Sequence, residues 1–188
     1  MMYDIHNEAR SIKGSFTHTF THSSGAEFLM KHEAGVVQVA LDIIKKMEVD
    51  LVVELGTLQG GFTKLVEDAL PNVEIHTFDH ENMTQGVREF FGPKVTFHVE
   101  NIIFNTANVA GLLERPERKL LYCDNGCKRR EVAMYSQFLN IGDYIGVHDW
   151  GNEIVWNDVK DHIGTWDRFM WCEVEEVGQT TRFWRKNA

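Results

Sequence analysis

The stretch VVELGTLQGGF, residues 52–62, decides how the rest of the sequence is interpreted. A short apolar run ends in a loop that contains Gly56, Gly60 and Gly61, and a helical pattern follows. This order predicts a buried strand, a tight turn and a helix, which together form the repeating unit of α/β proteins. The turn either cradles a ligand or simply reverses the chain with no ligand bound.

The spacing of the glycines separates three cofactor classes. A P-loop needs a lysine directly after its last glycine, and Phe62 stands there instead. A dinucleotide fingerprint needs a glycine where Leu58 stands, because the backbone must approach a pyrophosphate at that point. A ligand without phosphates needs only a tight turn beside an acidic strand end, and Glu54-x-Gly56-x-x-x-Gly60 supplies both. The loop therefore argues against NAD and FAD.

Outside this loop, short apolar runs alternate with helical patterns. The expected strands are residues 51–55, 73–78, 95–99, 119–123 and 144–147. The expected helices are residues 27–47, 63–70, 83–91, 106–114, 129–139 and 154–163. Residues 170–177 and 181–184, joined at 178–179, are typical of a final hairpin. This alternation predicts a parallel sheet with an antiparallel edge, whose ligands bind outside the carboxyl ends of the strands.

Asp79 follows the second expected strand, about 20 residues beyond the glycine loop. An acid at that place binds ribose hydroxyls in dinucleotide-binding α/β proteins, and the alternative is a helix cap or a solvated turn. We expect the ribose role because Asp79 comes in series with the glycine loop.

The segment Glu54-x-Gly56-x-x-x-Gly60 resembles motif I of the class I S-adenosylmethionine-dependent methyltransferases. Residues 120–151, LLYCDNGCKRREVAMYSQFLNIGDYIGVHDWG, resemble the branch with the macrocin-type sugar O-methyltransferases and the so-called cephalosporin hydroxylase. The resemblance implies a three-layer Rossmann-like methyltransferase fold, with a mostly parallel seven-stranded sheet and an antiparallel C-terminal hairpin strand. It implies S-adenosyl-L-methionine as cofactor, with Asn101 near the adenine. The implied cofactor-binding residues are Glu54, Gly56, Thr57, Gly60, Gly61, Asp79, Asn101 and Asp124.

Two acids follow neighbouring strands in this segment, Asp124 after the fourth and Asp149 after the fifth. Carboxylates at adjacent strand ends suit a hard divalent cation, which lowers the pKa of a substrate hydroxyl. The family binds magnesium there, so the resemblance implies Asp124, His148 and Asp149 as metal ligands, with Asp124 and Asp149 catalytic. A histidine ligand also suits manganese, iron or zinc. The alternative is that both acids line the cofactor pocket or cap helices.

The loop after the fourth strand departs from the family pattern. The family has Asp-x-Asp-His there, and this chain has Asp124-Asn125-Gly126-Cys127. Two functions therefore stay open. The first is metal-assisted O-methylation of a small-molecule hydroxyl, with sugars among the acceptors. The second is a domain that binds S-adenosylmethionine or a nucleoside as a sensor or structural subunit, without methylating anything.

Composition limits the partners and the location. The chain has 188 residues and a net charge of -9, which disfavours nucleic acid and anionic membranes. No apolar run approaches the roughly 20 residues that span a bilayer. Three cysteines and the lack of a secretory signal favour the cytoplasm. The basic run Lys128-Arg129-Arg130 is typical of a solvated helix face, and the alternative is that it holds an anionic substrate.

The chain divides into two expected parts. Residues 1–25 are polar and predict an arm, and residues 26–188 predict the methyltransferase domain. We expect the arm to cap the cofactor pocket or to reach a partner subunit. In the second case the protein would be a homo-oligomer. The expected substrate is a small molecule.

Overall fold

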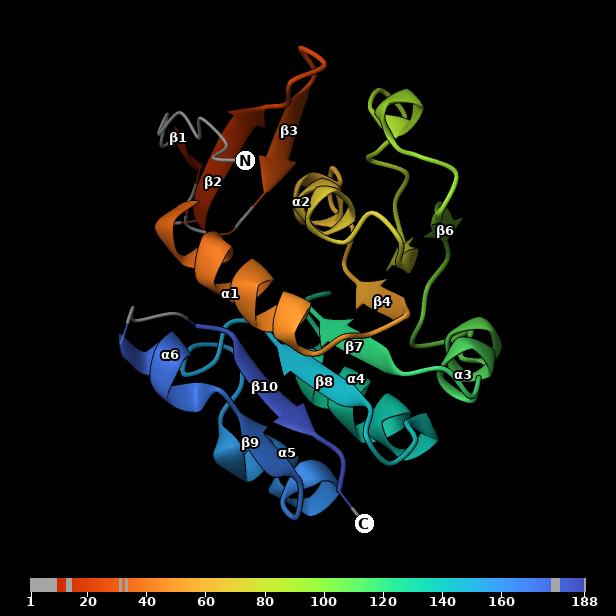
Figure 1. The fold of residues 1–188 in the computed structure, drawn as a ribbon, viewed down its shortest axis with the longest axis vertical. Coiled ribbons are helices and arrows are strands. Elements are labelled where there is room, and N and C mark those ends of the chain that lie inside the picture. Colours follow the sequence, from red (N-terminus) through yellow and green to blue (C-terminus); the bar gives the residue numbers. More distant parts are fainter. Residues whose placement is uncertain (1–9, 13–14, 31, 33, 177–179, 188) are drawn as a thin grey trace.

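The structure, a computed structural model, describes residues 10–12, 15–30, 32, 34–176 and 180–187. A large sheet runs through the middle of the molecule, and a small antiparallel sheet stands beside it (Figure 1). Within the described ranges, no helix combines the length and the apolar character that crossing a membrane requires.

The large sheet confirms the fold class expected from the sequence. Its strands in the described residues are β4 (Leu51–Leu55), β5 (Glu74–Asp79), β6 (Val95–Val99), β7 (Lys119–Cys123), β8 (Tyr144–Val147), β9 (Asp167–Phe169) and β10 (Arg182–Arg185). They lie in the order β6-β5-β4-β7-β8-β10-β9. Only β10 runs against its neighbours, and the other pairs are parallel. The sheet is thus seven-stranded and mostly parallel, and its antiparallel C-terminal strand β10 lies between β8 and the edge strand β9.

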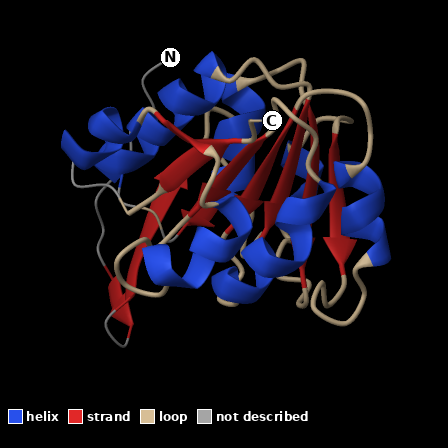
Figure 2. Cartoon of the chain, turned by 90° about the horizontal axis from the view of Figure 1, so that it is seen from below, coloured by secondary structure: helices blue, strands red, loops and turns tan. Residues whose placement is uncertain are grey.

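Helices cover both faces of this sheet, as Figure 2 shows. They are α1 (Ala34–Lys46), α2 (Gly61–Ala69), α3 (Ala107–Leu113), α4 (Lys128–Tyr135), α5 (Trp156–Ile163) and α6 (Trp171–Glu176), with 3-10 turns η1 (Arg88–Phe90) and η2 (Ser136–Phe138). One apolar cluster joins the sheet to α1, α2 and α6, and a second joins the other face to α3, α4 and α5. Every residue of β4 and β7 is buried, because both faces of these central strands are covered.

The small sheet consists of β1 (Arg10–Ile12), β2 (Ser15–Thr21) and β3 (Glu27–Met30), in that order. The predicted helix over residues 27–47 is therefore wrong in its first part, and α1 begins only at Ala34. Phe28 and Met30 are buried while Glu27 is exposed, which is the two-residue alternation of a strand. The pairing of β2 with β3 also ties residues 15–21 to residues 27–30, across the expected limit of the arm.

Two other expected elements are wrong. Residues 83–91 contain turns and the short η1 in place of a helix, and Gly86 interrupts the pattern. The strand expected at residues 170–177 is the helix α6, and the strand that pairs with β10 is β9, just before it. The sequence Cys-Glu-Val-Glu within α6 alternates like a strand, but four residues fit either period. The predicted turn at 178–179 lies outside the described residues.

Candidate active site at the carboxyl ends of the central strands

The order of the strands reverses between β4 and β7, which marks the place where open α/β sheets bind ligands. The hydrogen-bond ladder continues past the strand ends. Gly56 N donates to Phe78 O at 2.8 Å, Asp124 N to Leu55 O at 2.8 Å, and His148 N to Cys123 O at 3.1 Å. The loops after β4, β7 and β8 are therefore fixed side by side at one edge of the sheet.

Two glycines in the loop after β4 have a local structural reason. Gly56 has φ 105°, and a Cβ there would lie 2.5 Å from the Asp124 carbonyl oxygen. Gly60 has φ 77°, a left-handed conformation that favours glycine, directly before α2. A Cβ on Gly60 would meet the Phe91 ring at 3.0 Å. The turn needs these residues whether or not it binds a cofactor, so their predicted cofactor role stays a prediction.

Glu54 lies within the sheet at the base of the glycine loop and is 2% exposed. Its Oε2 accepts hydrogen bonds from Thr63 Oγ1 at 2.5 Å and from Thr77 Oγ1 at 2.6 Å. Thr57 Oγ1 is hydrogen-bonded to Thr77 Oγ1 at 2.6 Å and extends this network into the loop. Burial raises the pKa of Glu54 to about 8, so the carboxyl group is protonated at neutral pH. The acid therefore braces β4, β5 and α2.

Asp79, at the end of β5, is tied to the glycine loop. Leu58 N donates to Asp79 Oδ2 at 2.8 Å, and Glu81 N donates to Oδ1 at 3.2 Å. Oδ1 also lies 3.1 Å from His80 Nδ1, so Oδ2 is the oxygen that can accept a further hydrogen bond from a ribose hydroxyl. Asn101, beyond β6, is exposed, and its Oδ1 accepts a hydrogen bond from Ile103 N at 3.0 Å. Its predicted contact with adenine stays a prediction.

The ends of β7 and β8 bring Asp124, His148 and Asp149 together around a lysine. Lys128 Nζ lies 2.8 Å from Asp149 Oδ2 and 3.3 Å from Asp124 Oδ1, and it also donates to Glu153 Oε2 at 2.8 Å. His148 Nδ1 lies 3.1 Å from Asp124 Oδ1 and 3.3 Å from Asp149 Oδ2. The three residues predicted as metal ligands are thus neighbours, and the sequence did not foresee the lysine among them.

The charges of this cluster balance by mutual contact. Burial alone lowers the pKa of His148, but the negative charges of Asp124 and Asp149 outweigh it and raise this pKa to about 9. Burial disfavours ionised Asp124, yet His148 and, to a lesser extent, Lys128 favour the ionised form and keep the pKa of Asp124 below its usual value. Contact with His148 holds the pKa of Asp149 well below its usual value. At neutral pH both acids are ionised, and His148 is a cation.

The sequence also did not predict His32, which lies between β3 and α1. Its Nε2 lies 3.0 Å from Tyr122 Oη and 3.6 Å from Asp124 Oδ2, and its ring stacks on Phe62. Burial lowers the pKa of His32 to about 3, so the imidazole is neutral. Donor atoms of His32, Asp124 and His148 all lie within 4.8 Å of one another. No motif surrounds His32 in the sequence, and only the packing of β3 brings it here.

The position of Lys128 differs from the one expected from the sequence. We predicted a solvated face for Lys128-Arg129-Arg130, and this holds for Arg129 and Arg130, which are exposed. Lys128 is 4% exposed, because it is the first residue of α4 and its side chain reaches back over the strand ends. Its side chain can reach the acids because α4 begins four residues after Asp124, and no motif in the sequence marks this contact.

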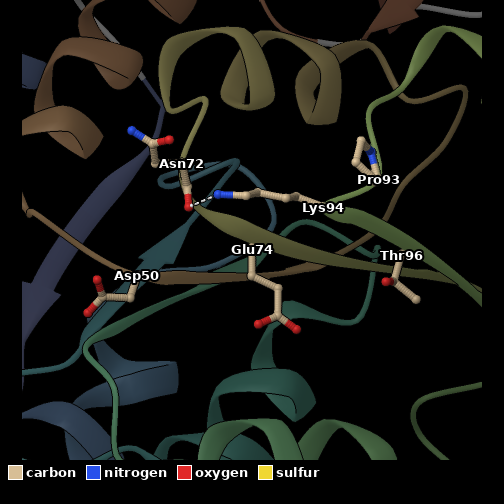
Figure 3. Close-up of a pocket in the computed structure, with 6 residues that line it drawn as sticks. All are labelled: Asp50, Asn72, Glu74, Pro93, Lys94 and Thr96. Carbon is tan, nitrogen blue, oxygen red and sulfur yellow. Dashed lines mark hydrogen bonds between the residues drawn. The ribbon is translucent and has the colours of Figure 1, made fainter.

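A separate cavity of about 360 Å³ opens at the opposite edge of the sheet (Figure 3). It is lined by residues that lie before or at the beginning of β4, β5 and β6: Asp50, Asn72, Glu74, Pro93, Lys94 and Thr96. Lys94 Nζ donates to Asn72 O at 2.6 Å and spans the cavity wall. The cavity is at the amino ends of the strands, where α/β sheets of this kind do not bind their cofactors.

Comparisons with known proteins give relatives by structure only. No protein-family profile matches the chain, and no curated protein matches its sequence. Human N-acetylserotonin methyltransferase in complex with SAM superposes with a TM-score of 0.56 at 12% identity, over 82% of this chain and 52% of that one. The N-methyltransferase NodS of Bradyrhizobium japonicum superposes with a TM-score of 0.52 at 10% identity, over 82% of this chain and 95% of that one. A cmcI structure with Mg and SAM superposes with a TM-score of 0.54 at 18% identity, over 76% of this chain and 62% of that one.

At these identities the likeness concerns the fold. The chain spans little more than half of the human protein's length, and the whole activity of such relatives does not transfer with the fold. The seven-stranded, mostly parallel sheet, the antiparallel C-terminal strand and the two helical layers nevertheless agree with the expectation from the sequence. The chain has the three-layer α/β fold of the class I S-adenosylmethionine-dependent methyltransferases.

Proposed function

We propose that this protein transfers the methyl group of S-adenosylmethionine to an oxygen of a small molecule. The observation that carries the proposal is the hydrogen bond from Leu58 N to Asp79 Oδ2, at the carboxyl ends of β4 and β5 and next to the point where the strand order reverses. It fixes a carboxylate for ribose hydroxyls beside a tight glycine turn that suits an amino-acid moiety. Such a pair of subsites matches a nucleoside that is joined to an amino acid.

Methyl transfer then takes place beside Asp124, on the adjoining strand. The acceptor oxygen bonds to the methyl carbon while the carbon–sulfur bond of the sulfonium breaks. The electron pair of that bond stays on sulfur, which yields S-adenosylhomocysteine and a methyl ether. The hydroxyl proton passes to Asp124 as the new bond forms, and Asp149 and His148 hold that carboxylate in place.

Trp150 favours a sugar or another ring compound as the acceptor. It directly follows Asp149, is half-buried and packs against Trp171 and Trp184, with ring centroids 5.9 and 5.1 Å apart. An aromatic side chain held by two others offers a rigid apolar wall next to the acids. Amines are the competing acceptors, because NodS shares this fold and is an N-methyltransferase.

The divalent ion expected from the sequence fits the residue types but not their arrangement. Two carboxylates and two imidazoles are suitable donors. However, Lys128 Nζ and His148 Nδ1 both face Asp124 Oδ1 and Asp149 Oδ2, the oxygens that an ion held between these two acids would need. The proposed transfer therefore uses the side chains alone.

The function is tested by incubating the protein with methyl-labelled S-adenosylmethionine and separate panels of sugars, phenols and amines. We expect label in methyl ethers. Asp124→Asn should lower the rate about 100-fold or more, since general bases contribute that much, while binding of S-adenosylhomocysteine stays within about threefold. Label only in amines would contradict O-methylation. Cofactor binding without transfer to any acceptor would favour the non-methylating domain.

A further inference from the structure

The ammonium group of Lys128 lies between two strand ends, where the acids of β7 and β8 converge. Three carboxylate oxygens surround it, from Asp149 and Glu153 at 2.8 Å and from Asp124 at 3.3 Å. A buried lysine is costly unless it is paired, and three acids around one ammonium group provide that pairing. This side chain is thus built into the site rather than resting on its surface.

A divalent ion would compete with this ammonium group for the same oxygens. Ligand oxygens lie about 2–2.6 Å from calcium or magnesium, so an ion on Asp124 and Asp149 would lie only a few ångströms from Nζ. Two like charges that close repel strongly in a partly buried site. His148 Nδ1 faces the same two oxygens from another side and takes up part of the space around them.

We propose that Lys128 is the resident cation of this site: its ammonium group holds Asp124 and Asp149 together and keeps divalent ions out. The lysine is a positioning residue, because it acts on the acids rather than on the methyl group. This inference rests on the proposed function, because it states which cation the proposed active site contains. Ion binding can nevertheless be measured whether or not the protein transfers methyl groups.

The test is Mn2+ binding, followed by the electron paramagnetic resonance signal of the free ion. Wild type and the conservative variant Lys128→Arg should leave the signal of added Mn2+ unchanged. Lys128→Met, which keeps an unbranched side chain that is one atom shorter but removes its charge, should bind one Mn2+ at least about tenfold more tightly than wild type. The same variant should gain thermal stability when Mn2+ is added.

Two controls and one replacement variant complete the design. Lys45→Met changes a lysine that is 45% exposed and paired with Asp42, so it should not gain Mn2+ binding. The double variant Lys128→Met with Asp149→Asn removes one charge of each sign, and it should fold without gaining the ion. If Lys128→Met alone does not fold, Lys128→Gln takes its place.

The wild-type measurement is decisive even without the variants. Stoichiometric Mn2+ binding by wild type would overturn the proposal, as would equal affinity in wild type and Lys128→Met. Both results concern the cation alone. The proposed function depends on binding of S-adenosylhomocysteine, which is measured separately.

Discussion

Gly56 is glycine because the end of β7 leaves no room for a side chain. A Cβ would lie 2.5 Å from the Asp124 carbonyl oxygen and 2.9 Å from Asn125 N, both of them backbone atoms. The backbone also has φ 105°, which is strained for any other residue. The glycine motif that the sequence displays is therefore required by the approach of β4 and β7, independently of a ligand.

Gly56→Ala should lower the free energy of unfolding by about 2–4 kcal/mol, because strain and overpacking add at this position. The matched control is Gly86→Ala, where an added Cβ meets nothing within 4 Å. We expect that control to stay within about 0.5 kcal/mol of wild type. Urea denaturation of the three proteins measures both values, and equal stability of the two variants would refute this explanation of Gly56.

Glu54 makes stability depend on pH in a defined direction. Burial raises its folded-state pKa to about 8 from an ordinary value of 4.5. The protonated acid therefore makes its full contribution to the free energy of unfolding below about pH 4.5. This contribution is lost as the pH rises toward 8, because only the unfolded state releases the proton of Glu54 between these two values.

Glu54→Gln should remove this dependence while keeping the acceptor for Thr63 and Thr77. Between pH 5 and 8, the free energy of unfolding of the variant should rise relative to that of wild type by about 1 kcal/mol per pH unit. Glu81→Gln, at a side chain that is 62% exposed, serves as the control. Parallel curves of unfolding free energy against pH for wild type and Glu54→Gln would show that the acid is not buried in its neutral form.

At the scale of elements, the sequence predicted those segments whose pattern fits a single period. The strands at residues 95–99 and 144–147 are found with the predicted bounds, and 119–123 likewise. Residues 27–30 and 171–176 were misassigned because a few apolar residues satisfy both the helical and the strand period, and packing decides between them.

The packing of β3 against α2 and the loop before β6 explains that choice. Phe28 is 1% exposed, and its ring meets Phe91 at 5.6 Å and Phe90 at 6.5 Å, edge to face. A Cβ added to Gly61, at the start of α2, would overlap the carbonyl group of Leu29. The strand therefore lies directly on the helix that follows the glycine loop.

Phe28→Ala should lower the free energy of unfolding by about 3–5 kcal/mol, as truncation of a buried aromatic residue usually does. Phe104→Ala, at a side chain that is 85% exposed, should change it by less than about 0.5 kcal/mol. Chemical denaturation compares the two. A small effect of Phe28→Ala would mean that β3 is not part of the cooperative fold.

At the scale of the whole molecule, the sequence predicted where a site would form better than what would fill it. Parallel strands bring Asp79, Asp124 and Asp149 to one edge of the sheet, which follows from topology alone. Lys128 and His32 reach the same edge from α4 and from the segment before α1, and their burial depends on tertiary packing. A single sequence does not display such contacts as a pattern.

The central claim is that the strand ends around β4 and β5 bind S-adenosylmethionine through Asp79. The most direct measurement is a calorimetric titration of wild type, Asp79→Ala and the control Glu81→Ala with S-adenosylhomocysteine. We expect wild type and Glu81→Ala to bind with similar affinity, and Asp79→Ala to bind at least about tenfold more weakly, because it loses charge-assisted hydrogen bonds to ribose. Absence of binding to wild type at millimolar ligand, or unchanged affinity in Asp79→Ala, would contradict it.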